Sequence, residues 1–187
     1  MRLIAITPGW GIGQGEGELS PEAVLAVLAE GAEVLVRERA LPEGLPLSRL
    51  ILHVRTPGAM AVATSLHASA DVDIASIRRL FSGRLTSSAH TPEEAGRKRA
   101  GGAEAVFLSP IFAARHGRPA RGVERLDGHI ALGGVTPENA GTCYDAGAIG
   151  IAVMGGIFSA GVTPSAARER VVRYRVALAD RGRPQMP

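Results

Sequence analysis

The sequence is poor in cysteine, in aromatic residues and in long apolar runs, and each shortage excludes a class of protein. Cys143 is the only cysteine in 187 residues, which excludes an internal disulfide framework and a zinc site built on clustered cysteines. Aromatic residues make up 4%, too few for a surface that stacks single-stranded nucleic acid. No apolar run approaches the ~18 residues of a membrane span, and the opening residues lack the apolar segment of a signal peptide. We therefore expect a cytoplasmic protein that binds no membrane and no nucleic acid.

Lysine is also scarce, so the positive charge is carried almost entirely by guanidinium groups. Lys98 is the only lysine, the sequence contains 20 arginines, and the net charge is +3. The longest basic run, Arg97-Lys98-Arg99, is only three residues long. Bases scattered in this way are typical of solvated helix faces rather than of a nucleic-acid-binding patch.

Glycine and proline, by contrast, are abundant and mark boundaries along the chain. There are 24 glycines and 12 prolines with no repeating period. A hydroxyl residue followed by proline is typical of a helix start, because the hydroxyl caps a free amide and proline needs no donor there. Four such pairs predict helices, and a fifth, Thr56-Pro57, is followed by a less favourable glycine. The four pairs are Ser20-Pro21, Thr91-Pro92, Thr136-Pro137 and Thr163-Pro164.

Short runs rich in apolar and β-branched residues alternate with these helices and predict eight strands. Several are apolar throughout, which suits parallel strands covered on both faces. The pattern predicts one α/β domain over residues 1–187, either a closed (β/α)8 TIM barrel or an open doubly wound sheet. The predicted strands are Leu3–Thr7, Glu33–Arg39, Arg49–Val54, Ser65–Ala68, Arg84–Ser88, Ala105–Ser109, Ile130–Gly133 and Gly150–Met154.

The connection between the second and third predicted strands is unusually short. Only residues 40–48 separate them, whereas a parallel crossover normally needs a dozen or more residues. We therefore expect the helix between these strands to be missing or nearly so. Leu41, Leu45 and Leu47 are available to cover the strand surface. A second copy of the chain would serve as well, and we expect a homodimer.

Histidines gather where the predicted strands end, which is where the active site of a TIM barrel lies. His53 and His67 lie at the ends of the third and fourth strands, His90 follows the fifth, and His116 lies in a long loop after the sixth. Histidine changes its charge near neutral pH and suits acid–base catalysis. His67 and His90 rank first, because they would project from strand ends. Asp71, after the fourth strand, is a candidate magnesium ligand, although an acidic helix start explains it slightly better.

Paired glycines follow the last two predicted strands. Gly133-Gly134 and Gly155-Gly156 would expose backbone amides without Cβ atoms, the usual phosphate site of a TIM barrel. The alternative is a pair of tight turns that need positive φ. A further glycine-rich stretch, residues 9–17, does not run straight into a helix, so we interpret it as a flexible loop and candidate lid rather than a dinucleotide cradle.

The order of these segments resembles the thiamine phosphate synthase/TenI superfamily of (β/α)8 barrels, and the TenI branch more closely. The resemblance is strongest over residues 131–137 and 146–159, and weaker at residues 36–39, 88–90 and 109–112. It implies a thiazole phosphate ligand seated on the paired glycines. The binding residues it implies are Arg37, Arg39, Ser88, Gly133, Gly134, Met154, Gly155, Gly156 and Arg118.

Two activities follow from the resemblance. Synthases couple a pyrimidine pyrophosphate to the thiazole phosphate with magnesium, whereas tautomerases move a proton within a thiazole carboxylate phosphate without a cofactor. The Asn-Asp pair that synthases carry after strand 3 is His53-Val54 here, which removes a metal carboxylate, and the tautomerase histidine on strand 6 is Pro110. We therefore expect a tautomerase that uses His67, His90, His53 or His116. The alternatives are a synthase and a non-catalytic binder of the same ligand.

Overall fold

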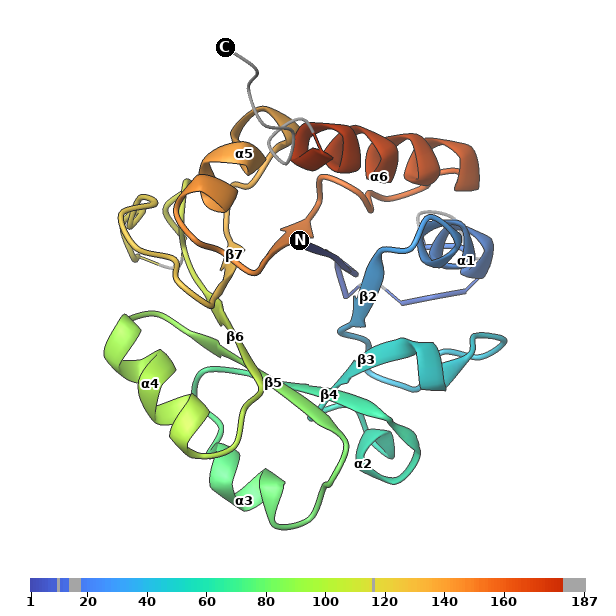
Figure 1. Ribbon diagram of the computed structural model, residues 1–187. Helices are drawn as coiled ribbons and strands as arrows, with labels where there is room; N and C mark the ends of the chain where they lie inside the picture. The colour runs from blue at the N-terminus through green and yellow to red at the C-terminus, as the bar shows by residue number, and fades with distance from the viewer. Residues whose placement is uncertain (10, 14–17, 116, 180–187) are drawn as a thin grey trace.

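The computed structural model describes residues 1–9, 11–13, 18–115 and 117–179 and contains a closed barrel of parallel strands. Every strand pairs with its sequence neighbours, and β8 pairs with β1 to close the ring (Figure 1). The closed barrel is therefore confirmed and the open sheet excluded. The strands are β1 (Arg2–Ile6), β2 (Glu33–Val36), β3 (Leu50–His53), β4 (Ser65–Ala68), β5 (Arg84–Ala89), β6 (Ala105–Leu108), β7 (Ile130–Leu132) and β8 (Gly150–Met154).

Four helices begin at the prolines expected from the sequence. They are α1 (Pro21–Ala29), α4 (Pro92–Ala100), α5 (Pro137–Asp145) and α6 (Pro164–Ala179). Ser20 Oγ accepts from the backbone N–H of Ala23 at 3.1 Å, and Thr91 Oγ1 accepts from that of Glu94 at 3.1 Å. Each hydroxyl thus satisfies an amide that has no partner within its helix.

The two remaining helices are short and start differently. The expected start at Thr56-Pro57 is wrong: α2 (Ala59–Val62) begins after Gly58, whose φ is +78°. The Thr56 hydroxyl donates instead to the backbone oxygen of Glu38 at 2.8 Å, so it caps no helix and ties two loops together. Helix α3 (Ile74–Arg78) is capped by the Asp73 carboxylate.

Alternate residues of the strands face two different apolar layers. Inward-facing side chains fill the barrel: Ile4, Ile6, Leu35, Ile51, Ala105, Phe107, Ile130 and Ala152. Their neighbours, such as Ala5, Val34 and Val106, pack outward beneath the helices. This alternation follows from the two-residue period of a strand, and it explains why strands of a covered barrel read as apolar throughout.

The expected loss of the helix between β2 and β3 is confirmed. The connection contains only a 3-10 turn, η1 (Leu47–Arg49). Leu45 is buried, and Leu41 and Leu47 pack against the outer core. These leucines therefore cover strand surface that a helix would otherwise cover. Strand β2 ends at Val36 rather than at Arg39, which places Arg37–Arg39 in the loop.

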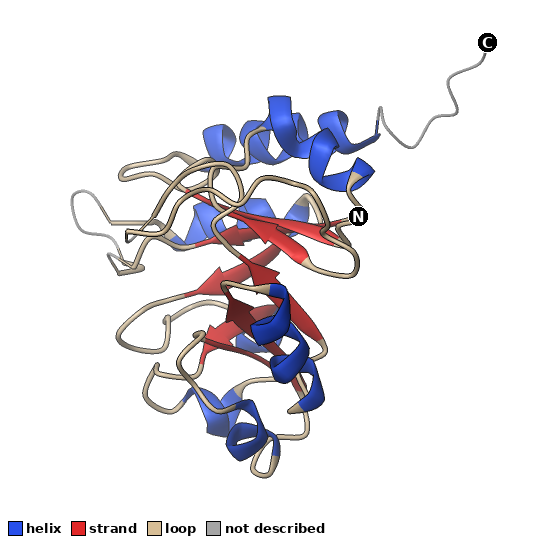
Figure 2. Cartoon of the chain, turned by 90° about the vertical axis from the view of Figure 1, so that its left-hand side faces the viewer, coloured by secondary structure: helices blue, strands red, loops and turns tan. Residues whose placement is uncertain are grey.

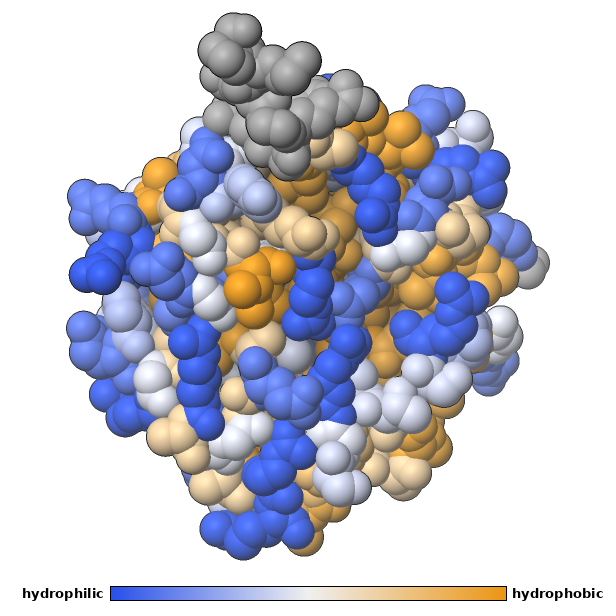
Figure 3. Space-filling model, in the orientation of Figure 1, coloured by the Kyte–Doolittle hydropathy of each residue, from blue (hydrophilic) through white to orange (hydrophobic). Residues whose placement is uncertain are grey.

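Figures 1 and 2 show the helices surrounding the strands, with all strands running in one direction between the two ends of the barrel. The face seen in Figure 3, which has the orientation of Figure 1, carries hydrophilic side chains across its middle. Over the residues that the structure describes, no helix is both long enough and apolar enough to cross a membrane.

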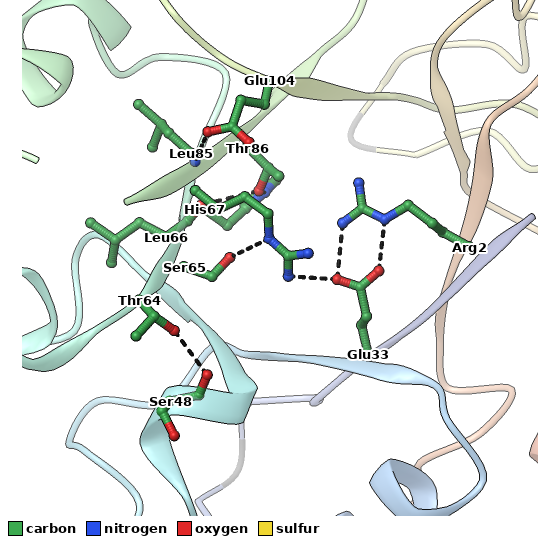
Figure 4. A network of polar contacts seen from close by, with 11 residues as sticks. Arg2, Glu33, Ser48, Thr64, Ser65, Leu66, His67, Leu85, Thr86 and Glu104 are labelled. Atoms are coloured by element: carbon green, nitrogen blue, oxygen red, sulfur yellow. Dashed lines mark hydrogen bonds and ion pairs between the residues drawn. The ribbon is translucent and has the colours of Figure 1, made fainter. Parts of the chain in front are cut away.

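An ionic network lies at the amino end of the barrel. The Glu33 carboxylate accepts from Arg2 Nε at 2.7 Å and Arg2 Nη2 at 2.9 Å, as Figure 4 shows, and from Arg84 Nη2 at 2.6 Å. Arg84 Nε also donates to Ser65 Oγ at 3.0 Å. These are the first residues of β1, β2, β4 and β5, so one carboxylate links strands from opposite parts of the ring.

Candidate active site

A cavity of about 650 Å³ opens at the carboxyl ends of the strands. Parallel strands bring their carboxyl ends to the same edge, so residues far apart in sequence meet there. Polar and charged groups form much of its wall, and apolar residues from inside the barrel, such as Phe107, form the rest. The polar lining residues are Arg37, His53, His67, Ser69, Asp71, Ser88, His90, Thr91, Glu94, Ser109, Arg115 and Arg118.

Most of the residues singled out from the sequence meet at this cavity. His53, His67, His90, Arg37, Arg118, Ser88, Asp71, Gly133 and Met154 all line it. Arg39 is exposed in the loop after β2 and is not a lining residue. His116 lies outside the described residues, as does much of the glycine-rich stretch 9–17. The fifth histidine, His129, precedes β7 at the opposite end of the barrel.

The paired glycines are held by packing as well as by turn geometry. A Cβ atom at Gly133 would lie 3.0 Å from Pro110 Cα, and one at Gly134 would lie 2.8 Å from the backbone nitrogen of Ala113; both have positive φ. A Cβ at Gly156 would meet Tyr174 Oη at 2.5 Å. Gly134, Gly155 and Gly156 are not lining residues of the cavity. Close approach of neighbouring segments therefore accounts for Gly133, Gly134 and Gly156, whereas Gly155 has a positive φ of +86° and open space around it. The phosphate role of these glycines stays a prediction.

His67 sits in a hydrogen-bonded chain at the floor of the cavity. Its Nδ1 lies 2.9 Å from Thr86 Oγ1, which donates to the Leu66 backbone oxygen at 3.1 Å. Because the Thr86 hydroxyl proton is used in that bond, Thr86 Oγ1 accepts a hydrogen bond from His67 Nδ1–H. The other ring nitrogen, Nε2, then accepts from Ser88 Oγ at 2.9 Å. Burial, then the positive charges of His53 and Arg37, lower the pKa of His67 to about 3. His67 is neutral at pH 7 and positions Ser88.

His53 is likewise neutral and tied to its neighbours. Its Nδ1 accepts from the backbone N–H of Arg55 at 3.2 Å, so Nε2 carries the proton and donates to Ser69 Oγ at 2.9 Å. Burial, then the positive charges of Arg37 and Arg55, lower its pKa to about 4. A group with so low a pKa is a weak base at neutral pH, which leaves His53 a positioning role.

His90 differs from the other two histidines in the nitrogen that it offers. Its Nδ1 lies 3.0 Å from the backbone oxygen of Ser109, and a carbonyl can only accept, so Nδ1 carries the proton. Nε2 is then the basic nitrogen of a ring that lines the cavity. The geometry thus separates two residues that the sequence ranked together: His90 is the histidine suited to proton transfer, and His67 is not.

Arginines supply the charge of the cavity. Arg37 Nη1 lies 3.6 Å from Met154 Sδ, and Arg115 Nη2 lies 3.9 Å from the same sulfur. Partial burial, followed by the positive charge of Arg115, lowers the pKa of Arg37. Arg118 comes from the same loop as Arg115 and also lines the cavity. Like charges held this closely attract an anion.

The donor groups do not suit magnesium. The lining carboxylates are Asp71 and Glu94; Asp71 pairs with Arg55, and Glu94 accepts from the backbone N–H of His90 at 2.8 Å. Within the described ranges, no group of three His, Cys, Asp or Glu side chains could hold a metal ion. Mg²⁺ prefers carboxylate oxygens, whereas this wall presents guanidinium groups.

Five polar lining residues were not among the predicted site residues: Ser69, Thr91, Glu94, Ser109 and Arg115. Ser69 and Ser109 follow β4 and β6 directly, so a rule that reads every polar residue after a strand would have found them. Glu94 lies in the first turn of α4, where the sequence indicates only a favourable helix start. Arg115 stands out in the sequence as a charge in the loop, but only the fold brings it opposite Arg37.

Comparison with known proteins agrees with this architecture. A family model described as thiamine monophosphate synthase (TMP-TENI) matches residues 49–157. A thiamine-phosphate synthase from Chloroflexus aurantiacus is 33% identical over 148 residues, which cover 72% of this chain and 67% of the relative.

Solved structures share the fold at lower identity. A thiamine phosphate pyrophosphorylase from Pyrococcus furiosus superposes with a TM-score of 0.70, at 18% identity over 96% of each chain. One from Bacteroides thetaiotaomicron gives 0.64 at 20% identity, over 96% of this chain and 98% of that one. A 3-hexulose-6-phosphate synthase superposes with a TM-score of 0.61 at 18% identity, over 95% of this chain and 100% of that one. Likeness at such low identity shows the barrel fold alone. Because the family model covers more than half of the sequence, the chain belongs to the thiamine phosphate synthase/TenI superfamily.

Proposed function

We propose that the protein is a thiamine-phosphate synthase, which joins a pyrimidine pyrophosphate to a thiazole phosphate and releases pyrophosphate. The named relative from Chloroflexus supports this reaction over the tautomerase expected from the sequence. The observation that carries it is the pair of guanidinium groups, Arg37 and Arg115, that meet at Met154 in the mouth of the cavity.

The cavity suits the two anionic ends of such a substrate pair. Arginine binds phosphate oxygens through two parallel N–H groups, and Arg37, Arg115 and Arg118 come from two different loops. The floor is apolar where Phe107 and Leu35 line it, which suits flat heterocycles. Charged groups at the rim and apolar groups below would orient both substrates with their anions outward.

The chemical step needs charge control more than a protein nucleophile. The C–O bond between the pyrimidine methylene and pyrophosphate breaks, and the electron pair leaves with pyrophosphate. The thiazole nitrogen then donates its lone pair to the same carbon, so the new C–N bond makes the ring a cation. No proton or electron is left over. Positive groups near the leaving oxygens lower the barrier because they stabilise the charge that develops there.

The test is formation of thiamine phosphate from the two substrates. Purified protein is incubated with both, and product and pyrophosphate are followed by chromatography and phosphorus NMR. We expect equal amounts of product and pyrophosphate, formed only when both substrates are present. Pyrophosphate release without product, or no release at high enzyme concentration, contradicts the proposal.

His90 favours a second candidate reaction, tautomerisation of a thiazole carboxylate phosphate. Its Nε2, the ring nitrogen that does not bond to Ser109, belongs to a ring on the cavity wall, and an imidazole nitrogen can take a proton from one carbon and return it to another. Exchange of deuterium from solvent into the thiazole, followed by proton NMR, tests it. We expect exchange by the wild-type protein and by the His67→Gln variant, and none by His90→Gln; exchange by His90→Gln at the wild-type rate would exclude this role.

A further inference from the structure

We propose that Tyr174 of α6 is a positioning residue for substrate binding, because its hydroxyl holds together the turns that follow β7 and β8. We call residues 133–135 the β7 turn and residues 155–157 the β8 turn. The inference rests on the synthase function proposed above, whose thiazole phosphate is predicted to lie on these turns. Tyr174 itself does not line the cavity, so it would act on the substrate only through the turns.

The first observation is that one hydroxyl oxygen contacts both turns. Tyr174 Oη donates to the backbone oxygen of Val135, in the β7 turn, at 3.1 Å. A Cβ atom at Gly156, in the β8 turn, would lie only 2.5 Å from the same oxygen and 2.8 Å from Val153 Cγ1. Gly156 has no positive φ, so its backbone conformation does not require glycine. The missing side chain at Gly156 therefore makes room for Tyr174 and Val153.

The second observation is that the Tyr174 hydroxyl is buried and stays a donor. Only 3% of Tyr174 is exposed. Burial, followed by the negative charge of Glu138, raises the pKa of Tyr174 to about 12, so the hydroxyl is protonated at neutral pH. A buried hydroxyl is costly unless it is hydrogen-bonded, and phenylalanine would fill the same apolar space without that cost. The bond to Val135 therefore explains why the ring carries a hydroxyl.

The third observation is that the carbonyl side of the β7 turn is fully bonded while its amide side is open. Among the residues that the structure describes, none accepts a hydrogen bond from the backbone N–H of Gly133, Gly134 or Val135. Successive amides of this kind suit an anion such as phosphate. The carbonyl oxygens accept from Phe112 N–H at 2.8 Å (Gly133), from Asn139 Nδ2 at 2.9 Å (Gly134) and from Tyr174 Oη (Val135).

A second residue of α6 holds the β8 turn. Arg170 Nη1 donates to the backbone oxygen of Ile157 at 2.9 Å and to Ser159 Oγ at 3.0 Å. Arg170 and Tyr174 are four residues apart and so lie on the same face of the helix. One helix therefore fixes both turns, with Arg170 on the β8 turn and Tyr174 on the β7 turn. A site built from two loops binds well only when its supporting residues fix their spacing.

The kinetic constants of Tyr174→Phe in the synthase assay test the inference. This variant keeps the ring and loses only the hydroxyl. We expect its KM for thiazole phosphate to rise about 3- to 10-fold, the effect of one hydrogen bond. Its kcat and its KM for the pyrimidine pyrophosphate should stay within about 2-fold of wild type, because a general loss of structure would change all three constants. Tyr144→Phe is the matched control, since it removes a hydroxyl from a tyrosine of α5 that is 43% exposed.

Gly156→Ala tests the same contact from the β8 turn. Its methyl group would collide with the Tyr174 hydroxyl, so the KM for thiazole phosphate should rise here too. In the Tyr174→Phe background that hydroxyl is gone, and Gly156→Ala should raise the KM by a smaller factor than it does alone. Equal factors in the two backgrounds would mean that the hydroxyl does not couple the turns, and would overturn the inference.

Calorimetric titration with thiazole phosphate separates this inference from the proposed function. Tyr174→Phe should bind the compound more weakly than Tyr144→Phe does. Equal binding by these two variants, or a wild-type protein that does not bind thiazole phosphate, overturns the positioning role. If thiazole phosphate binds but no thiamine phosphate forms, the synthase function fails, and the titration still decides the role of Tyr174.

Discussion

The two ends of the barrel use arginine in opposite ways. At the amino end, Arg2 and Arg84 share the Glu33 carboxylate, which lies between them. At the carboxyl end, Arg37 and Arg115 face each other across the sulfur of Met154. At one end two arginines share a carboxylate, and at the other two arginines approach the same thioether.

The difference separates the groups that hold the barrel closed from those that act on a ligand. Paired charges between strands stabilise the ring, and conserved chemistry in TIM barrels is found at the opposite face. Like charges held close together lower stability, and they persist where a ligand compensates them. Substitutions at the two ends should therefore change stability in opposite directions.

The largest effect on stability is expected at the amino end. Glu33→Gln removes the negative charge while Arg2 and Arg84 remain close to each other. Glu33 is partly buried, with 24% of its side chain exposed, so the loss should be about 2–3 kcal/mol in the free energy of unfolding. Urea denaturation at pH 7 measures it.

Glu104→Gln is the matched control for this substitution. Glu104 pairs with Arg78 at 3.4 Å, and 56% of its side chain is exposed, so its loss should stay below about 1 kcal/mol. Equal losses for the two variants would mean that the network at Glu33 is no more than a surface ion pair.

Acid should destabilise the two ends in different pH ranges. Unfolded histidine has a pKa of 6.5, against about 3 for native His67 and about 4 for native His53. Below pH 6.5 the unfolded chain therefore binds protons that the native protein does not, and stability falls as pH falls. For His67 the loss should be about 2 kcal/mol at pH 5.

Glu33 responds only at lower pH. Its native pKa lies below 4.5 because the bonds from Arg2 and Arg84 outweigh the opposing effect of burial, so its contribution is complete above pH 4.5 and is lost as pH falls through the native pKa. Urea unfolding at half-unit steps from pH 7 to pH 5 resolves the histidine range. His67→Gln should reduce the slope there, and Glu33→Gln should leave it unchanged; an unchanged slope in His67→Gln would contradict the assignment.

The fold was largely predictable because most helices and strands have a local sequence signal. Hydroxyl–proline pairs and apolar runs depend on hydrogen bonding and burial within a few residues, so four helix starts and all eight strands follow from them. The exception is instructive: Thr56-Pro57 has the same chemistry as the others, but its hydroxyl bonds to Glu38 across the barrel rim. A tertiary contact overrode a local preference.

The site was predictable only as a neighbourhood. Strand ends pointed to His53, His67 and His90, and the structure brings them to one cavity. Which histidine is basic could not be foreseen, because that depends on Thr86 and Ser109, whose atoms decide which nitrogen carries the proton. The approach of Arg37 and Arg115 to the same Met154 sulfur could not be predicted either, because it depends on the path of the loop after β6.

A smaller effect, of opposite sign, is expected at the carboxyl end. Arg37→Met removes one of two like charges from an exposed side chain, so the free energy of unfolding should rise by about 0.5 kcal/mol or less. Thermal unfolding at low salt measures the gain, and a clear loss of stability would contradict the picture of repelling charges.

The smallest effect should come from the ion pair of Asp71 with Arg55, which lies at the carboxyl end but resembles the amino-end network in composition. Its side chains are 67% and 60% exposed. Solvent screens such a pair, and holding two mobile side chains costs entropy, so Asp71→Asn should change stability by less than about 0.5 kcal/mol. Urea denaturation of Asp71→Asn, measured alongside Glu33→Gln, gives the comparison. A loss comparable to that of Glu33→Gln would show that burial does not determine how much each ion pair contributes to stability.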